Sequence, residues 1–337
     1  MEDKNVVLST KPGASLHVSI LRKPDSDTLV VFLNGLALPS GAWIETADQL
    51  LNLRAESNQP VPSLLCYDRY GQGKSDSDPS DPPGSPYGHD LRTSVADLDQ
   101  LLAQISQEEL QRRTPEDLRL IFVCNSIGVA LARLYAAEHP GRVEAYLFLD
   151  SIVAHTDFIS IFPDPDEPGF DESKLPEDVT ADDLRHARTK FRQFFHPSLP
   201  NSEKLDRRQL KELLPRADGP ALPDGSGGRP PLLVVVGHDF DTFAEQCEHV
   251  SRLRRPTLQD AVLTSSVWQG PLSVPKAVIN RYMNPAWASY NEGLTRLTKV
   301  KGVVKIASKC GHFIQKDDPA FVAAEINNIL NALEDCK

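Results

Sequence analysis

The sequence predicts an α/β protein with a mostly parallel, eight-stranded sheet, covered by helices on both faces and carrying an inserted helical lid. Segments typical of strands and of helices alternate along most of the chain. The expected strands are unbroken apolar runs, such as TLVVFL and LLVVV, as in parallel sheets buried on both faces. A chain of 337 residues can form one large domain with an insertion, or two domains.

Residues 1–150 supply most of the expected sheet. The chain opens with two short strands separated by the turn sequence TKPGA, and continuous apolar runs follow. The expected strands of this part lie at residues 5–9, 15–21, 28–33, 63–67, 118–124 and 143–150. Residues 41–53 and 89–110 show helical periodicity, and a third helix is expected directly after Ser126.

Residues 151–230 differ in composition from the rest of the chain. They contain ten of its 27 prolines and the glycine-rich stretch DGSGGRP, with short helical patterns such as residues 180–195. Proline and glycine interrupt regular structure, so this segment is not expected to contribute to the sheet. We therefore assign residues 1–150 and 231–337 to the core, and residues 151–230 to a lid inserted between the sixth and seventh strands.

The strand–helix alternation resumes after the insertion. A strand at residues 231–238, a helix at 242–255, a strand at 302–307 and a helix at 319–334 are expected. Residues 255–290 look like a second, irregular insertion, with three aromatic residues of interest: Trp268, Tyr282 and Trp287. These aromatic side chains either shape an apolar pocket or pack in the core.

Composition excludes several classes of function. The net charge of −11 argues against binding a nucleic-acid backbone, which requires clustered lysine and arginine. No stretch approaches the roughly 18 apolar residues of a membrane span, and the N-terminal residues do not resemble a secretory signal. The five cysteines are odd in number and form no C-x-x-C pair, so neither a zinc site nor a disulfide framework is indicated. We expect a cytoplasmic protein that does not associate with membranes.

The candidate nucleophile is Ser126, in the stretch Cys124-Asn125-Ser126-Ile127-Gly128. A run of strand formers ends there and a helix follows at once, so the serine occupies a tight turn whose flanking residues must be small. Such a turn holds the hydroxyl above the sheet, and the helix N-terminus beside it favours an anion. The alternative is that Ser126 only caps the helix.

A second strand-to-helix turn contains candidate oxyanion-hole residues. The stretch VFLNGLALPSGAW ends a strand in small residues, so a backbone N–H near Leu36 can reach the site from the other side. Together with the N–H of Ile127 it would bind an oxyanion, and each such donor typically lowers a barrier by roughly 3 kcal/mol. The alternative is an ordinary turn without a catalytic role.

The candidate general base is His312, in the stretch SKCGHFIQ. This histidine follows the last expected strand, lies on a glycine turn and precedes a helix. Histidine titrates near neutral pH, so it can accept a proton and return it under physiological conditions.

Taken in order, Asn34-Gly35, DRYGQGKS at residues 68–75, CNSIG and KCGHF resemble the motifs of the α/β-hydrolase superfamily. The resemblance extends from about residue 28 to residue 330. It implies a nucleophile, histidine and acid triad, with no metal and no organic cofactor. Two positions depart from the usual motifs, since Asn34 replaces a common histidine and Cys124 replaces a glycine.

The resemblance offers two positions for the acid of the triad, which fixes the histidine tautomer and stabilises the imidazolium. The usual position, after the seventh strand, holds Phe240, and Asp239 and Asp241 flank it. The other is the tip of the sixth strand, where Asp150 lies 24 residues after Ser126. We select Asp150 and keep Asp241 and Asp239 as alternatives.

These observations predict a serine hydrolase that cleaves a carboxylic ester or lactone of a small, largely apolar molecule through an acyl-enzyme on Ser126. The same triad would also suit a carbon–carbon bond hydrolase, a thioesterase or a lyase, because one fold hosts many reactions. A non-catalytic receptor for a small molecule is the third alternative.

Overall fold

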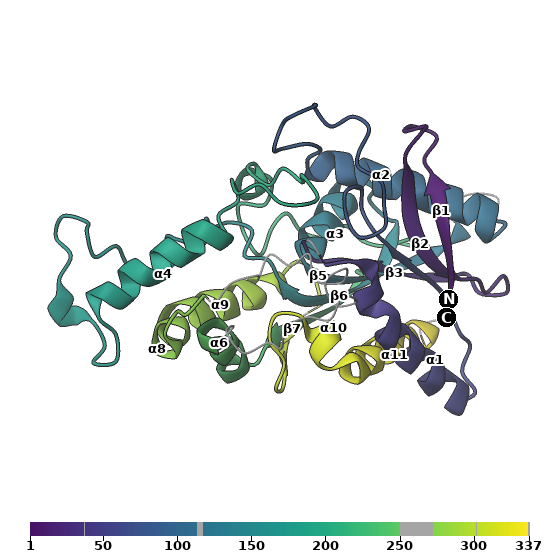
Figure 1. Cartoon of the computed structure of the whole chain (residues 1–337). Helices are drawn as coiled ribbons and strands as arrows, with labels where there is room; N and C mark the ends of the chain where they lie inside the picture. Colours follow the sequence, from purple (N-terminus) through teal and green to yellow (C-terminus); the bar gives the residue numbers. More distant parts are fainter. Residues whose placement is uncertain (37, 113–116, 250–271, 301, 336–337) are drawn as a thin grey trace.

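The computed structural model describes residues 1–36, 38–112, 117–249, 272–300 and 302–335. Eight strands form one twisted sheet in the order β1-β2-β4-β3-β5-β6-β7-β8 (Figure 1). The strands are β1 (Glu2–Val7), β2 (Ser15–Leu21), β3 (Thr28–Leu33), β4 (Ser63–Tyr67), β5 (Arg119–Ser126), β6 (Val143–Ser151), β7 (Leu232–His238) and β8 (Val304–Ala307). The pairs β1–β2 and β2–β4 are antiparallel, and the other neighbours are parallel. The predicted fold class is confirmed.

The first strand begins earlier than its alternating pattern predicts. It covers Glu2–Val7 in place of residues 5–9, because Glu2 pairs with Ile20 and the ladder extends beyond the apolar residues. Pairing with a neighbouring strand, which a local pattern does not contain, sets this boundary.

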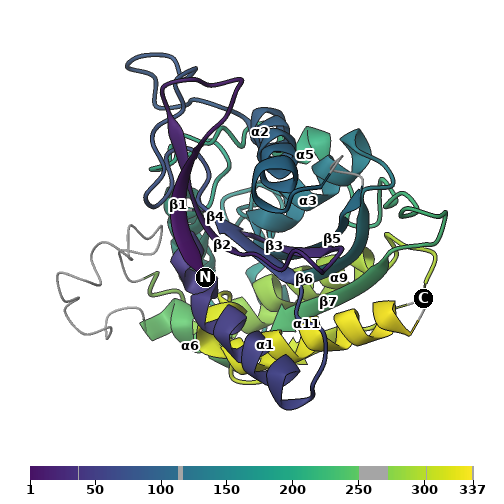
Figure 2. The same ribbon diagram turned by 90° about the vertical axis from the view of Figure 1, so that its right-hand side faces the viewer.

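Both faces of the sheet are buried. Along β3, Leu29 and Val31 belong to one core cluster, and Val30 and Phe32 belong to the other. Helices α1 (Ile44–Glu56) and α11 (Pro319–Glu334) cover one face, whereas α2 (Leu91–Gln104) and α3 (Ile127–Glu138) cover the opposite face (Figure 2). This two-sided burial explains why the strands are continuous apolar runs.

The chain between β6 and β7 contains little regular structure, as its composition predicts. Its helices are a short 3-10 turn (Glu172–Lys174), α4 (Ala181–Phe194) and α5 (Leu210–Leu213). Helix α4 begins at a capping box formed by Thr180 and Asp183, and it extends away from the sheet (Figure 1). Leu184, Ala187 and Phe191 form its buried face.

The prediction of an irregular segment at residues 255–290 is wrong where the structure describes it. Residues 250–271, which include Trp268, lie outside the described residues, but α8 (Lys276–Val278), a π turn (Ile279–Met283) and α9 (Asn284–Leu294) are helical. Pro285 lies in the first turn of α9, directly after the π turn. A proline removes one helical donor and clashes with the preceding turn, and the wider π turn accommodates this.

Helix α6 (Phe240–His249) follows β7, and α10 (Ile314–Asp317) precedes α11. No helix in the described part of the chain is both long and apolar enough to cross a bilayer. Cys66, Cys124, Cys247 and Cys310 are free and buried, and burial raises the pKa of each thiol.

Candidate active site

Ser126 ends β5, and Ile127 begins α3. The backbone of Ser126 has φ 55° and ψ −120°, a strained conformation for a residue with a side chain. Its side chain makes no capping hydrogen bond to α3, which contradicts the alternative that Ser126 only caps the helix. Gly128 allows α3 to approach β3 closely, since a Cβ there would lie 2.3 Å from the Leu33 carbonyl oxygen. The turn therefore holds the hydroxyl group of Ser126 away from the helix backbone.

Asn125, which precedes the serine, connects the three chain segments of the site. Its amide nitrogen donates to the carbonyl oxygens of Leu149 and His312, at 3.1 and 3.0 Å. Its amide oxygen accepts a hydrogen bond of 3.2 Å from Gln315. Because Asn125 is fully buried, these bonds fix the ends of β5 and β6 and the loop after β8 relative to one another.

Asp150 and His312 form a hydrogen-bonded pair. Asp150 is fully buried near the end of β6, and its Oδ2 lies 2.6 Å from Nδ1 of His312. Nδ1 donates to the carboxylate, so Nε2 is the ring nitrogen that makes no bond to Asp150. His312 and Ser126 line the same cavity, although no hydrogen bond joins these two described residues. In enzymes without substrate such bonds are often long and tighten on binding.

His238, at the end of β7, is a third member of this cluster that the sequence did not reveal. Its Nδ1 lies 2.9 Å from Oδ1 of Asp150, and its Nε2 lies 3.0 Å from Oδ1 of Asn284. The Asn284 amide nitrogen donates to Phe240 O and Asn280 Oδ1, so the amide oxygen is the atom that faces the histidine. Both ring nitrogens of His238 therefore face acceptor oxygens, an arrangement that favours the imidazolium form.

The two histidines keep Asp150 ionised. Burial raises the pKa of this carboxyl, but the charges and hydrogen bonds of His238 and His312 outweigh it and lower the pKa to about 2. Burial also lowers the pKa of His238, and the adjacent Asp150 more than offsets that effect, so its pKa is raised. Asp150 and His238 thus form a buried ion pair behind His312.

The other two candidate acids face elsewhere. Asp239 caps α6, since its carboxylate accepts from the backbone N–H groups of Thr242 and Lys309, at 3.0 and 3.3 Å. The side chain of Asp241 is 78% exposed and lies 3.3 Å from Nζ of Lys276. Of the three carboxylates, Asp150 is the one that the structure brings to His312.

The loop that carries Leu36 is held by hydrogen bonds from the loop after β4. Arg69 donates to the carbonyl oxygens of Asn34 and Gly35, at 2.8 and 2.9 Å, and Gln72 donates to the latter at 3.0 Å. These bonds fix the carbonyl groups of Asn34 and Gly35 toward the side chains of Arg69 and Gln72. Leu36 lines the same cavity as Ser126.

This cavity has a volume of about 50 Å³. Most of its wall is apolar and is formed by Ile152, Phe158, Phe194, Phe195, Trp287 and Phe313. Trp287 combines the two roles expected for the aromatic residues, because it lines the cavity and is also buried, donating to Ser151 O at 2.8 Å. Tyr282 instead packs against Phe162, with ring centroids 6.4 Å apart.

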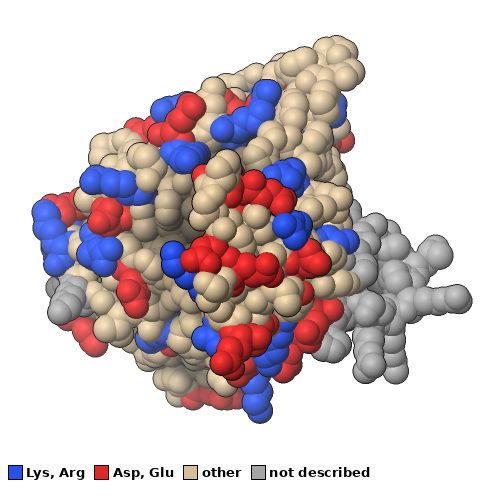
Figure 3. All heavy atoms as spheres, turned by 90° about the vertical axis from the view of Figure 1, so that its left-hand side faces the viewer, with Lys and Arg blue, Asp and Glu red and all other residues tan. Residues whose placement is uncertain are grey.

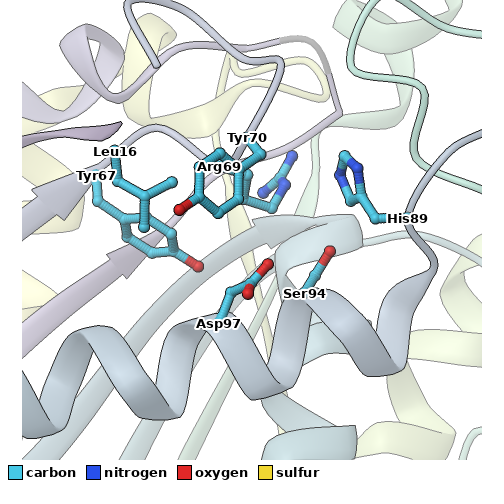
Figure 4. Close-up of a pocket in the computed structure, with 7 residues that line it drawn as sticks. All are labelled: Leu16, Tyr67, Arg69, Tyr70, His89, Ser94 and Asp97. Atoms are coloured by element: carbon cyan, nitrogen blue, oxygen red, sulfur yellow. The ribbon is translucent and has the colours of Figure 1, made fainter. Parts of the chain in front are cut away.

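A smaller cavity of about 10 Å³ lies beside α2 (Figure 4). Ser94 and Asp97 project toward it from α2, and the hydroxyl groups of Tyr67 and Tyr70 and Nε2 of His89 have no hydrogen-bond partner among the described residues. The volume and the polar wall suit one water molecule.

Three residues near this smaller cavity offer the donor set of a metal site. Asp78, Asp81 and His89 place one potential ligand atom each within 4.8 Å of one another. Nζ of Lys11 already lies 2.5 Å from Asp78, so a cation of the chain pairs with this carboxylate. The cluster is accounted for by this ion pair.

The fold and this site define a class of protein: an α/β-fold hydrolase with a polar residue on the turn between β5 and α3. The chain belongs to the alpha/beta hydrolase family, whose sequence model matches residues 30–325. Among curated proteins, none shows significant similarity to this sequence.

Several solved structures share the fold. A thermophilic esterase from Thermogutta terrifontis is 14% identical, covers 98% of this chain and 99% of its own, and has a TM-score of 0.51. For a putative lipase from Acinetobacter baumannii AYE the identity is 13%, the coverages 100% and 93%, and the TM-score 0.52. A haloalkane dehalogenase loop variant from Bradyrhizobium elkanii is 15% identical, with coverages of 100% and 99% and a TM-score of 0.50. At these identities the similarity shows the fold and not the substrate.

Proposed function

We propose that the protein is a serine hydrolase that cleaves a carboxylic ester or lactone of a small, largely apolar molecule. The observation that carries the proposal is the 2.6 Å contact between Asp150 and His312 at the wall of the cavity that Ser126 also lines. A histidine oriented by a buried carboxylate, beside a serine hydroxyl in the same cavity, is the arrangement that acyl transfer requires.

In the proposed reaction, Ser126 Oγ attacks the ester carbonyl while Nε2 of His312 accepts the hydroxyl proton. Backbone N–H groups of Leu36 and Ile127 stabilise the oxyanion, and Ile127 suits this role because the first amides of a helix lack intrahelical partners. The protonated His312 then donates its proton to the departing alkoxide, which leaves as the alcohol. His312 then accepts a proton from water, whose oxygen attacks the acyl carbonyl. As the bond to Ser126 Oγ breaks, His312 returns this proton to Oγ, and the carboxylic acid leaves.

The proposal assigns residues 151–230 to a lid over this site. Phe158, Phe194 and Phe195 from this segment line the cavity, so the lid would supply apolar contacts for the substrate. A serine on the turn after β5, in place of an aspartate, favours acyl transfer over haloalkane chemistry.

Covalent labelling tests the proposal. A fluorophosphonate probe should form an adduct on Ser126, and Ser126→Ala should abolish both the adduct and the hydrolysis of p-nitrophenyl esters, lowering kcat by about 10⁴-fold or more. Ser160→Ala, at an exposed serine of the lid, is the matched control and should label normally. Equal turnover by wild type and Ser126→Ala would remove Ser126 from the mechanism.

A further inference from the structure

Arg207 is a buried cation in the wall of the active-site cavity. It belongs to the segment between β6 and β7, it is only 5% exposed, and it lines the cavity together with Ser126 and His312. The rest of the wall is almost entirely apolar. A charged group in such surroundings is costly unless something neutralises it.

No carboxylate of the described residues forms an ion pair with Arg207. One terminal nitrogen of its guanidinium lies 3.4 Å from His196 O and 3.3 Å from Leu199 O, which are long contacts, and its Nε has no partner among the described residues. Burial lowers its pKa to about 10, although the charges of Glu203 and Asp206 act to raise it. The guanidinium therefore has N–H groups, including that of Nε, that are available to bind a ligand.

The two nearest acidic residues are engaged with other cations. Glu203 binds Arg69 at 2.8 Å and also accepts from Gln72 at 2.7 Å. Asp206 binds the neighbouring Arg208 at 2.6 Å. Arg207 is therefore a buried cation for which no described residue supplies a carboxylate partner.

We propose that the substrate carries a carboxylate that binds Arg207 while its ester or lactone carbonyl lies at Ser126. This inference rests on the proposed function and specifies its substrate class. A guanidinium matches a carboxylate in a two-bond geometry, and one buried cation in an apolar wall suits a single negative charge better than a phosphate dianion. The apolar side chains between the two ends would contact a short hydrocarbon spacer.

The anion preference would come from this buried contact rather than from the surface. On the face shown in Figure 3, lysine and arginine side chains are scattered among aspartate and glutamate side chains. A neutral analogue would leave the guanidinium unpaired inside the cavity, and sites with buried polar groups discriminate strongly against ligands that leave them unpaired.

Two matched pairs of substrates test the inference, and the readout is the ratio of kcat/KM for the charged member to that for the neutral member. One pair compares mono-p-nitrophenyl adipate with p-nitrophenyl hexanoate, after subtraction of spontaneous hydrolysis. The other compares 4-carboxyphenyl hexanoate with phenyl hexanoate, which places the carboxylate on the leaving group. Wild type should prefer the charged member of one pair by about 10- to 100-fold.

Arg207→Met should reduce that ratio to about one or less, and Arg207→Lys should restore part of it because it returns the charge without the planar fork. The ratio is measured within one variant, so it does not depend on how much protein folds. Arg208→Met, at an adjacent arginine whose side chain is 53% exposed, is the control and should retain the wild-type ratio.

The outcomes separate the two proposals. If neither neutral nor charged esters are cleaved and the fluorophosphonate probe leaves no adduct, the proposed function is wrong. If neutral esters are cleaved but wild type shows no preference in either pair, or Arg207→Met keeps the preference, the function stands and the role of Arg207 is wrong.

Discussion

Two buried basic side chains, His238 and Arg207, lie near the candidate site, and they differ in the partners that the chain provides for them. His238, at the end of a sheet strand, has a carboxylate partner in Asp150 and an amide partner in Asn284. Arg207, in the insertion, has two long contacts to carbonyl oxygens and no ion pair with a described carboxylate. The comparison teaches that the chain itself neutralises the buried charge on the sheet side of the site, whereas on the side of residues 151–230 no described carboxylate forms an ion pair with the buried cation.

Asp150→Asn tests the paired side and should have the largest effect. It removes the anion that both histidines share, so we expect kcat for p-nitrophenyl esters to fall about 10⁴-fold. The free energy of unfolding should also fall by about 3 kcal/mol, because His238 loses its counterion in a buried position. Steady-state kinetics and urea unfolding measure the two effects.

Asp241→Asn is the matched control for that substitution. Asp241 is exposed, so its loss should change the free energy of unfolding by less than about 0.5 kcal/mol and leave kcat at the wild-type value. The opposite result, with Asp241→Asn inactive and Asp150→Asn active, would assign the acid to the loop after β7.

His238→Gln tests the paired side through the pH dependence of the free energy of unfolding. The pKa of His238 is raised in the folded state, so its protonation stabilises the fold fully below the ordinary histidine value of about 6.5. This contribution is lost as pH rises through the raised pKa. The stability difference between wild type and His238→Gln, about 1–2 kcal/mol, should therefore be larger at pH 6 than at pH 9.

The charged groups around His238 do not reverse this sign. Asp150 remains ionised over the whole range because its pKa is about 2, and the charge of Asp239 also favours the imidazolium. Urea unfolding at the two pH values measures the difference. Equal differences at both values would show that His238 is neutral in the folded protein.

Arg207→Met should have a smaller effect on stability than Asp150→Asn or His238→Gln, and one of opposite sign. Replacing a buried cation that lacks an ion pair by an apolar side chain of similar length should raise the free energy of unfolding by about 1 kcal/mol. Arg133→Met is a useful contrast, since Arg133 donates to Tyr290, Arg216 and Gly219 at 2.7–3.0 Å and its removal should destabilise. A loss of stability in Arg207→Met would mean that the chain itself neutralises this cation.

Sequence patterns predicted the parts of the site that are local in the chain. Ser126 and His312 each follow a recognisable strand and precede a helix, so a short stretch defines their position. Asp150 was selected because the family resemblance offers an acid position at the tip of the sixth strand, and Asp150 lies there, 24 residues after Ser126. Its neighbour His238 was missed, although parallel strands that pair at Leu149 and Val236 necessarily bring the two strand ends together.

The path of residues 151–230, the proposed lid, could not be predicted from the sequence for a different reason. Arg207 belongs to an irregular segment and yet lines the cavity, and the path of such a segment depends on tertiary packing that no periodic pattern encodes. The helices after Lys276 were missed, and the π turn directly before Pro285 absorbs the interruption that a proline causes in a helix. The composition of the strands therefore predicts the fold class, whereas the residues that line the pocket depend on long-range contacts.

With His238 protonated, the positive and negative charges around the site would balance at each stage of the proposed reaction. At rest, an imidazolium at His238 and the carboxylate of Asp150 would sum to zero beside His312. When His312 becomes positive, the nascent oxyanion becomes negative, so the interior again carries no excess charge. An ester whose carboxylate binds Arg207 would add one more ion pair with no net charge. The low-dielectric interior would then carry no net charge at any stage between substrate binding and product release.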